Sequence, residues 1–205
     1  MALKRLSQKI HPPINTEHMK IQPALPSHAN LIAKAVMMAI GDEICAGFAA
    51  PDHTLADVER LFTTLAAMPD SQYSYANTLI AIDETTNEVM GLCVSYDGAQ
   101  LHTLRQRFFE EARKQLNRDM EGMADETSPD EFYIDTLATL PHHRGKGVGT
   151  ALLQASVEKA HAAEKPAALL VDKTNPRAAA LYHSLGFRHI GDRPFAGVLM
   201  SHMRL

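Results

Sequence analysis

The stretch F-Y-I-D-T-L-A-T-L-P-H-H-R-G-K-G-V-G, residues 132–149, decides how this chain folds. Its first nine residues are rich in aromatic and β-branched side chains and stop before a proline, which predicts a strand at 132–140. Glycines then occupy every second position, as Gly145, Gly147 and Gly149, and helical spacing follows to about residue 163. The stretch therefore predicts a strand, a glycine-rich turn and a helix in succession.

A turn of this composition is suited to binding a phosphate or pyrophosphate. Glycine tolerates positive φ and lets a ligand approach the main-chain N–H groups closely. The N-terminus of the following helix favours an anion through its free N–H groups and its dipole. Arg144 and Lys146 add positive charge at the same place. The alternative is tight packing of the turn without any ligand.

Two familiar phosphate motifs fit this turn poorly. A P-loop needs Ser or Thr directly after its lysine, whereas Lys146 is followed by Gly147. A dinucleotide fingerprint needs a third glycine where Thr150 stands, although Asp172 at the end of the next predicted strand would suit it. Too little chain follows Asp172 to complete a doubly wound sheet. A dinucleotide-binding oxidoreductase stays the weaker alternative.

The rest of the chain alternates between predicted strands and helices. Pattern and turn residues predict strands at 19–24, 78–83, 89–96, 168–172, 188–192 and 197–205. They predict helices up to Gly41, at 54–68, and from the N-cap Asn175 to the stop at Gly186. The sequence thus predicts one α/β domain over 19–205, preceded by an arm at 1–18.

Residues 101–123 form a predicted amphipathic helix between the third and fourth strands. Leu101, Leu104, Phe108, Ala112 and Leu116 recur at intervals of three and four, with charged residues on the other face. Such a helix packs against a core or against a partner subunit. We expect this insert to lie beside an acceptor cleft or to form a homodimer contact.

Composition excludes several classes of protein. The 205 residues carry a formal charge of −4, which argues against a nucleic-acid partner held by a basic face. No apolar stretch approaches the ~20 residues needed to cross a bilayer, so no membrane partner is expected. The N-terminus lacks the apolar region of a secretory signal, and two cysteines are too few for a disulfide framework. We expect a cytoplasmic protein.

Two motifs resemble those of the GNAT superfamily of acetyl-CoA-dependent N-acetyltransferases. The segment 139–149, T-L-P-H-H-R-G-K-G-V-G, is similar to its acetyl-CoA signature. The segment 175–187, N-P-R-A-A-A-L-Y-H-S-L-G-F, is similar to a second motif that follows the first in that superfamily. The resemblance is close over about 132–190 and only topological over 19–100. It implies the GNAT α/β fold, a mixed central sheet of six or seven strands flanked by helices, with acetyl-CoA as co-substrate.

The resemblance also assigns the donor site. Main-chain N–H groups of the turn would hold the pyrophosphate, namely those of Arg144, Gly145, Lys146, Gly147, Val148, Gly149 and Thr150. The end of the preceding strand would splay from its neighbour and offer Leu137, Ala138 and Thr139 to the pantetheine arm. Asn175 would contact the same arm, although it is already explained as an N-cap. Tyr182 would protonate the departing thiolate, although it also suits core packing.

The implied reaction is direct attack of a primary amine on the thioester, without an acyl-enzyme. Asp135 is the candidate base, because it shares a strand face with Leu137 and Thr139; a structural Asp is the alternative. The amine belongs to a small molecule or a protein, and the charged loop 41–53 would form part of the wall of the acceptor cleft. A non-catalytic acyl-CoA-binding protein of the same fold is the main alternative. Adjacent His142 and His143 do not predict a metal site.

Overall fold

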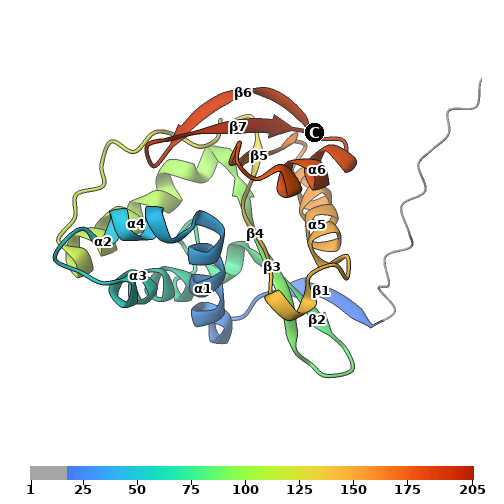
Figure 1. Ribbon diagram of the computed structural model, residues 1–205, viewed down its shortest axis with the longest axis horizontal. Helices are drawn as coiled ribbons and strands as arrows, with labels where there is room; N and C mark the ends of the chain where they lie inside the picture. Colours follow the sequence, from blue (N-terminus) through green and yellow to red (C-terminus); the bar gives the residue numbers. More distant parts are fainter. Residues whose placement is uncertain (1–17) are drawn as a thin grey trace, which may run out of the picture.

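A seven-stranded mixed sheet runs through the described chain, residues 18–205 of this computed structural model (Figure 1). Nearly all of the predicted arm at 1–18 lies outside the described residues. The strand order is β1-β2-β3-β4-β5-β7-β6. The strands are β1 Met19–Pro23, β2 Thr78–Asp83, β3 Val89–Asp97, β4 Phe132–Thr139, β5 Ala167–Val171, β6 Arg188–Phe195 and β7 Val198–Arg204.

Neighbouring strands are antiparallel throughout this sheet except at one place. Strands β1 to β4 pair in sequence as an antiparallel meander, and β5, β7 and β6 form a second antiparallel group. Only β4 and β5 run parallel among the described strands. This confirms the mixed sheet expected from the resemblance, and it excludes the doubly wound parallel sheet of the dinucleotide-binding alternative.

Helices cover both faces of the sheet (Figure 1). Strand residues alternate between the two faces, so that Ile80 packs with one group of helices and Ala81 with the other. The first four helices share one core cluster, and the last two pack in the other. The helices are α1 Ala29–Ile40, α2 Asp42–Ala49, α3 Leu55–Ala67, α4 Leu101–Leu116, α5 Val148–Ala162 and α6 Pro176–Ser184.

The prediction of a loop at 41–53 is wrong, because most of these residues form helix α2. Asp42 and Glu43 lie in the first turn of α2, where negative charge interacts favourably with the helix dipole. On its inner face the Phe48 ring meets Phe62 and Phe108, with centroid distances of 6.2 and 5.7 Å. The two acidic residues that indicated a solvated loop are therefore the exposed start of a helix whose other face is buried.

Helix α4 is the predicted insert, but it ends at Leu116 and not at residue 123. Asn117 adopts the left-handed conformation with φ of 50°, and the N–H groups of Asn117 and Arg118 both donate to the Ala112 carbonyl. Met120 and Met123 continue the apolar spacing because they pack against the same core after the helix has ended. The apolar spacing therefore continues past the end of the helix because these residues are buried, although the backbone there is no longer helical.

Arg105 ties this insert together from the buried face of α4. Its side chain is 2% exposed, and its guanidinium lies 3.2 Å from both the Asp125 and the Glu126 carboxylates. These acidic residues belong to the segment that leads from α4 back to β4. The position of α4 against the sheet is thus linked to the path of that returning segment.

Loss of the Arg105 guanidinium leaves the buried Glu126 carboxyl without its cation. We expect Arg105→Met to lower the free energy of unfolding by about 3–5 kcal/mol. The matched control is Arg107→Met on the same helix, where the guanidinium is 43% exposed and pairs with Asp70 at the surface. The control should leave stability close to wild type because exposed pairs contribute little. Urea denaturation measures both, and equal losses would contradict the role given to burial at position 105.

Candidate functional site

A cavity of about 640 Å³ opens where β4 and β5 part. The two strands pair only from Phe132–Ile134 to Ala167–Leu169, although β4 continues to Thr139. The cavity is lined by the unpaired ends of both strands, the start of α5, the helix α6 and the end of α1. The splay expected between these two strands is therefore present, and it makes the site.

The glycine-rich turn forms one end of this cavity. Gly145 and Gly147 have φ of +78° and +82°, a region that residues with a Cβ rarely adopt. The first bond of the helix runs from the Ala151 N–H to the Gly147 carbonyl, so the three preceding N–H groups have no acceptor within the helix. Arg144 is exposed beside them, and its Nε donates to the Thr139 carbonyl at 3.4 Å. This end of the cavity is suited to an anion.

The cavity brings together all but one of the side chains and main-chain segments assigned to the donor site. Lys146 is the exception, because it is exposed on the turn and does not line the cavity. The lining includes Leu137, Ala138, Thr139, Arg144, Gly145, Gly147, Val148, Gly149, Thr150, Asn175 and Tyr182. Asn175 also accepts a hydrogen bond from the Ala178 N–H at 3.0 Å, so it is the N-cap of α6 as well.

Tyr182 projects from α6 into the same cavity. Its ring lies 6.1 Å from that of Phe187, and it packs at the edge of the core beneath α5 and α6. Burial raises the pKa of the Tyr182 phenol to about 12, with the nearby Cys93 thiol as a second cause. The phenol therefore keeps its proton at neutral pH and can donate it inside the cavity.

Asp135 lies on the cavity face of β4, two residues before Leu137. Its side chain is half-buried, while its neighbours Ile134 and Thr136 are buried. Asp135 accepts hydrogen bonds from Tyr96 Oη and Thr136 Oγ1, each at 2.9 Å. Burial raises the pKa of the Asp135 carboxyl, while these two hydrogen bonds act in the opposite direction. A carboxyl of raised pKa in a cavity is a candidate proton acceptor.

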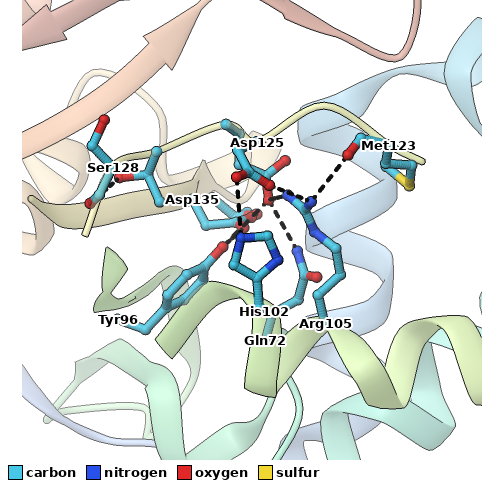
Figure 2. Close-up of polar contacts among 11 residues, drawn as sticks. Gln72, Tyr96, His102, Arg105, Met123, Asp125, Ser128 and Asp135 are labelled. Atoms are coloured by element: carbon cyan, nitrogen blue, oxygen red, sulfur yellow. Dashed lines mark hydrogen bonds and ion pairs between the residues drawn. The ribbon is translucent and has the colours of Figure 1, made fainter. Parts of the chain in front are cut away.

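Behind Asp135 lies a buried polar cluster that the sequence analysis did not identify (Figure 2). It consists of Gln72, Tyr96, Arg105 and Glu126, all nearly or fully buried. Glu126 accepts a hydrogen bond from Gln72 Nε2 at 3.2 Å and lies 3.4 Å from Tyr96 Oη. One signal was available, because Arg105 stands at helical spacing within the apolar stripe of α4. The position of Glu126 in a polar loop gave no such signal.

The remaining lining of the cavity is mostly apolar. It comes from the end of α1, from α2 and from the strands β5, β6 and β7. Its larger side chains are Ile40, Ile44, Leu170, Phe195 and Met200. A ligand in this part of the cavity would meet hydrocarbon on most sides. The cavity is also lined by the charged side chains of Asp135, Asp172, Arg144 and Arg177. Asp172 accepts hydrogen bonds from the Thr174 N–H and Oγ1.

Two other features are absent from the part of the chain that the structure describes. Within residues 18–205, no three His, Cys, Asp or Glu side chains gather closely enough to share a metal ion. No helix in that range combines the length and the apolar character that crossing a bilayer requires.

Solved structures with this fold include several acetyltransferases. One described as an acetyltransferase has a TM-score of 0.72 at 27% identity, with 90% of this chain and 97% of that chain covered. An N-acetyltransferase from Staphylococcus aureus Mu50 has a TM-score of 0.76 at 24% identity, with 91% and 100% covered. The yncA protein of Salmonella typhimurium, determined with its cofactor acetyl-CoA, has a TM-score of 0.55 at 16% identity, with 92% and 93% covered.

Sequence comparison gives one short match and one extended match. An uncharacterized protein of Mycobacterium leprae is 41% identical over 68 residues, which is 33% of this chain and only 18% of that protein. The Acetyltransferase (GNAT) family matches residues 50–187, well over half of the chain. That range contains the splayed strand β4, the glycine-rich turn and the motif that ends at Phe187. The chain therefore belongs to the GNAT acetyltransferase family.

Proposed function

We propose that this protein transfers the acetyl group of acetyl-CoA to a primary amine of a small molecule or protein. One observation carries the proposal. A single cavity joins an anion-binding helix start, a protonated phenol at Tyr182 and a carboxyl of raised pKa at Asp135. The yncA neighbour was determined with acetyl-CoA, which supports the choice of donor at the level of the shared fold.

The donor fits the residues present at the turn. The pyrophosphate would lie on the N–H groups at the start of α5, next to the Arg144 guanidinium. At Gly149 an added Cβ would make ordinary van der Waals contacts, 3.4 Å from Thr139 Oγ1 and 3.7 Å from Leu181, and so would occupy space between residues that line the cavity. The pantetheine arm would lie along the unpaired edge of β4, where Leu137 to Thr139 have no partner on β5.

The chemistry needs one proton acceptor and one proton donor. The amine substrate arrives as an ammonium, and Asp135 takes one proton from it, directly or through a water. The free amine attacks the thioester carbonyl, so that a C–N bond forms and a tetrahedral intermediate carries the negative charge on oxygen. The C–S bond then breaks, and the Tyr182 phenol donates a proton to the CoA thiolate. The nitrogen, which became positively charged on attack, gives up its second proton, and this proton restores the phenol through solvent. The proton taken by Asp135 is released to solvent. No acyl-enzyme forms.

The apolar part of the cavity favours an amine carried on an apolar body. Ile40, Ile44 and Phe195 offer hydrocarbon contacts, and Asp135 offers one negative charge for one ammonium. Further cationic groups on the acceptor would have to be desolvated against apolar walls. A monoamine with an alkyl or aryl body is therefore the best-matched acceptor.

Donor binding should depend on Arg144 more than on its neighbour Lys146. We expect Arg144→Ala to weaken acetyl-CoA binding about tenfold, because a cation beside the pyrophosphate is lost. Lys146→Ala is the matched control in the same turn, and its effect should be much smaller because Lys146 is outside the cavity lining. Isothermal titration calorimetry measures both. Stabilisation of the protein by NAD and not by acetyl-CoA would contradict the proposed donor.

Turnover should depend on the Tyr182 hydroxyl. We expect Tyr182→Phe to lower kcat roughly 100-fold to 10,000-fold, because the thiolate leaves without its proton, while acetyl-CoA binding is retained. Since the pKa of Tyr182 is raised to about 12, the required protonated form persists across the neutral and mildly basic range. The wild-type rate should therefore show no loss from this group as pH rises through that range. Thiol release in stopped-flow or plate assays measures both effects.

The choice of acceptor is tested with a panel of amines. Arylalkyl and alkyl monoamines should show higher kcat/KM than polyamines of similar length, because only one ammonium is matched by Asp135. Phe195→Ala should lower kcat/KM for the arylalkyl amines while leaving acetyl-CoA binding unchanged. Equal rates for polyamines would contradict the acceptor class. Binding of acetyl-CoA with no thiol release in any amine would favour the alternative of a non-catalytic acyl-CoA-binding protein.

A further inference from the structure

The carboxyl of Asp135 is joined to a second buried carboxyl by one tyrosine. Tyr96 Oη lies 2.9 Å from Asp135 Oδ2 and 3.4 Å from Glu126 Oε1. Neither Tyr96 nor Glu126 lines the cavity, so Tyr96 contacts Asp135 from within the protein and Glu126 lies behind Tyr96. Figure 2 shows the Tyr96 hydroxyl and the Arg105 guanidinium directed toward the place where Asp135 lies. A substrate would touch only the first of these two carboxyls.

The Tyr96 hydroxyl carries one hydrogen, and this limits how Tyr96, Asp135 and Glu126 can form hydrogen bonds with one another. When Tyr96 donates that hydrogen to Asp135, its oxygen can still accept a hydrogen bond. Glu126 can supply that bond only while its carboxyl is protonated. Protonated Glu126 therefore fixes the Tyr96 hydroxyl toward an ionised Asp135, and ionised Glu126 competes with Asp135 for the same hydrogen.

The charges around the pair do not balance two ionised carboxyls. Within the described chain, the guanidinium in contact with Glu126 is that of Arg105, and Arg105 is shared with Asp125 at 3.2 Å. The other groups that face the pair are neutral at pH 7. They are Tyr96 and Cys93 from β3, Tyr133 and Thr136 from β4, and Gln72 and Tyr73 from the segment before β2.

The ionisation of Glu126 reflects this imbalance. Burial, and after it the charge on Asp135, raise the pKa of the Glu126 carboxyl to about 7, although Arg105 acts in the opposite direction. Burial also raises the pKa of Asp135. Near neutrality the two carboxyls therefore share a proton, and the titration belongs to the pair.

We propose that Glu126, supplied by the segment inserted between β3 and β4, is a positioning residue that controls the charge state of Asp135 through Tyr96. Arg105 holds Glu126 in place from α4, and Gln72 holds it from the other side. The insert thereby acts on the cavity without lining it. The catalytic meaning of this control rests on the proposed function, in which Asp135 is the base.

The direct test is the titration of the two carboxyls in the whole protein, followed by carbon-13 NMR of labelled Asp and Glu side chains. The Asp135 signal is identified by its loss in Asp135→Asn. In the wild type this signal should follow two steps. Glu126→Gln replaces the second carboxyl by a neutral group of the same shape. Asp135 should then titrate in a single step, because the upper step is lost, and its titration midpoint should fall by about one pH unit.

Asp125→Asn is the matched control. Asp125 also pairs with Arg105 at 3.2 Å, but its side chain is 44% exposed and makes no contact with Tyr96. The two steps of Asp135 should persist in this variant. An unchanged Asp135 curve in Glu126→Gln would overturn the proposal, and so would an equal change in Asp125→Asn.

A second variant changes the Asp135 curve in the opposite direction. Tyr96→Phe removes the hydrogen bond that favours ionised Asp135, so its titration midpoint should rise. A merely structural role would not give shifts of opposite sign. If Glu126→Gln yields no folded protein, Tyr96→Phe decides alone, and an unchanged midpoint there overturns the proposal.

The titration needs neither acetyl-CoA nor an amine, so it stands apart from the proposed function. In the active enzyme, the acidic limb of the kcat/KM profile should move with the Asp135 midpoint in each variant. A shifted carboxyl curve with an unmoved acidic limb would remove Asp135 as the base of the proposed reaction. It would still support the control of its charge by Glu126.

Discussion

The parting of β4 from β5 after Ile134 is the constraint on which the rest of the site depends. Backbone N–H and C=O groups in a protein interior require partners, yet the β5-facing groups of residues 135–139 have none on that strand. On its other edge β4 stays paired with β3 as far as Thr139 opposite Gly91. The strand therefore remains rigid while one edge is free, which is what an extended ligand arm with amide groups can use. Helix α5 begins at the end of this opening because only the glycine-rich turn separates it from β4.

The segment inserted between β3 and β4 supports the part of the site around Asp135, and both of its ends pack against the rest of the fold. Helix α4 packs on α3 through the rings of Phe108 and Phe62, 6.3 Å apart. The end of the returning segment is held to the β6–β7 pair, where Glu131 lies 3.0 Å from the buried His202 and Arg193 donates to Ser128. Because both ends are held, the position of Glu126 between them is set by packing on two sides. A long insertion of this kind adds a second layer behind the carboxyl of Asp135, and it does so without narrowing the cavity.

Local patterns predicted most of the fold and most residues at the glycine-rich end of the cavity, whereas contacts between residues distant in sequence left no local pattern. The strand, turn and helix at 132–162 follow from spacing and glycine alone, so they were visible in one sequence. Helix α2 was missed because its acidic first turn and Gly41 resemble a loop, while its burial depends on α3 and α4. The predicted helix at 101–123 extends past its observed end at Leu116 because apolar spacing continues after Asn117. Glu126 could not be found at all, since its burial depends on an arginine twenty-one residues earlier in the chain.

The distribution of charge explains how a chain with a net charge of −4 suits the proposed pair of substrates. At the turn, the helix dipole and Arg144 present positive potential to a polyanionic donor. Deeper in the cavity, Asp135 presents negative potential to a cationic amine, and behind it one guanidinium faces two carboxyls. The Asp135 carboxyl lies within β4, and the positive potential lies at the turn beyond the end of that strand, so the two substrates would be attracted to different parts of the cavity. Net charge averages over this separation, and the separation would let one cavity hold the proposed donor and acceptor, which carry opposite charges.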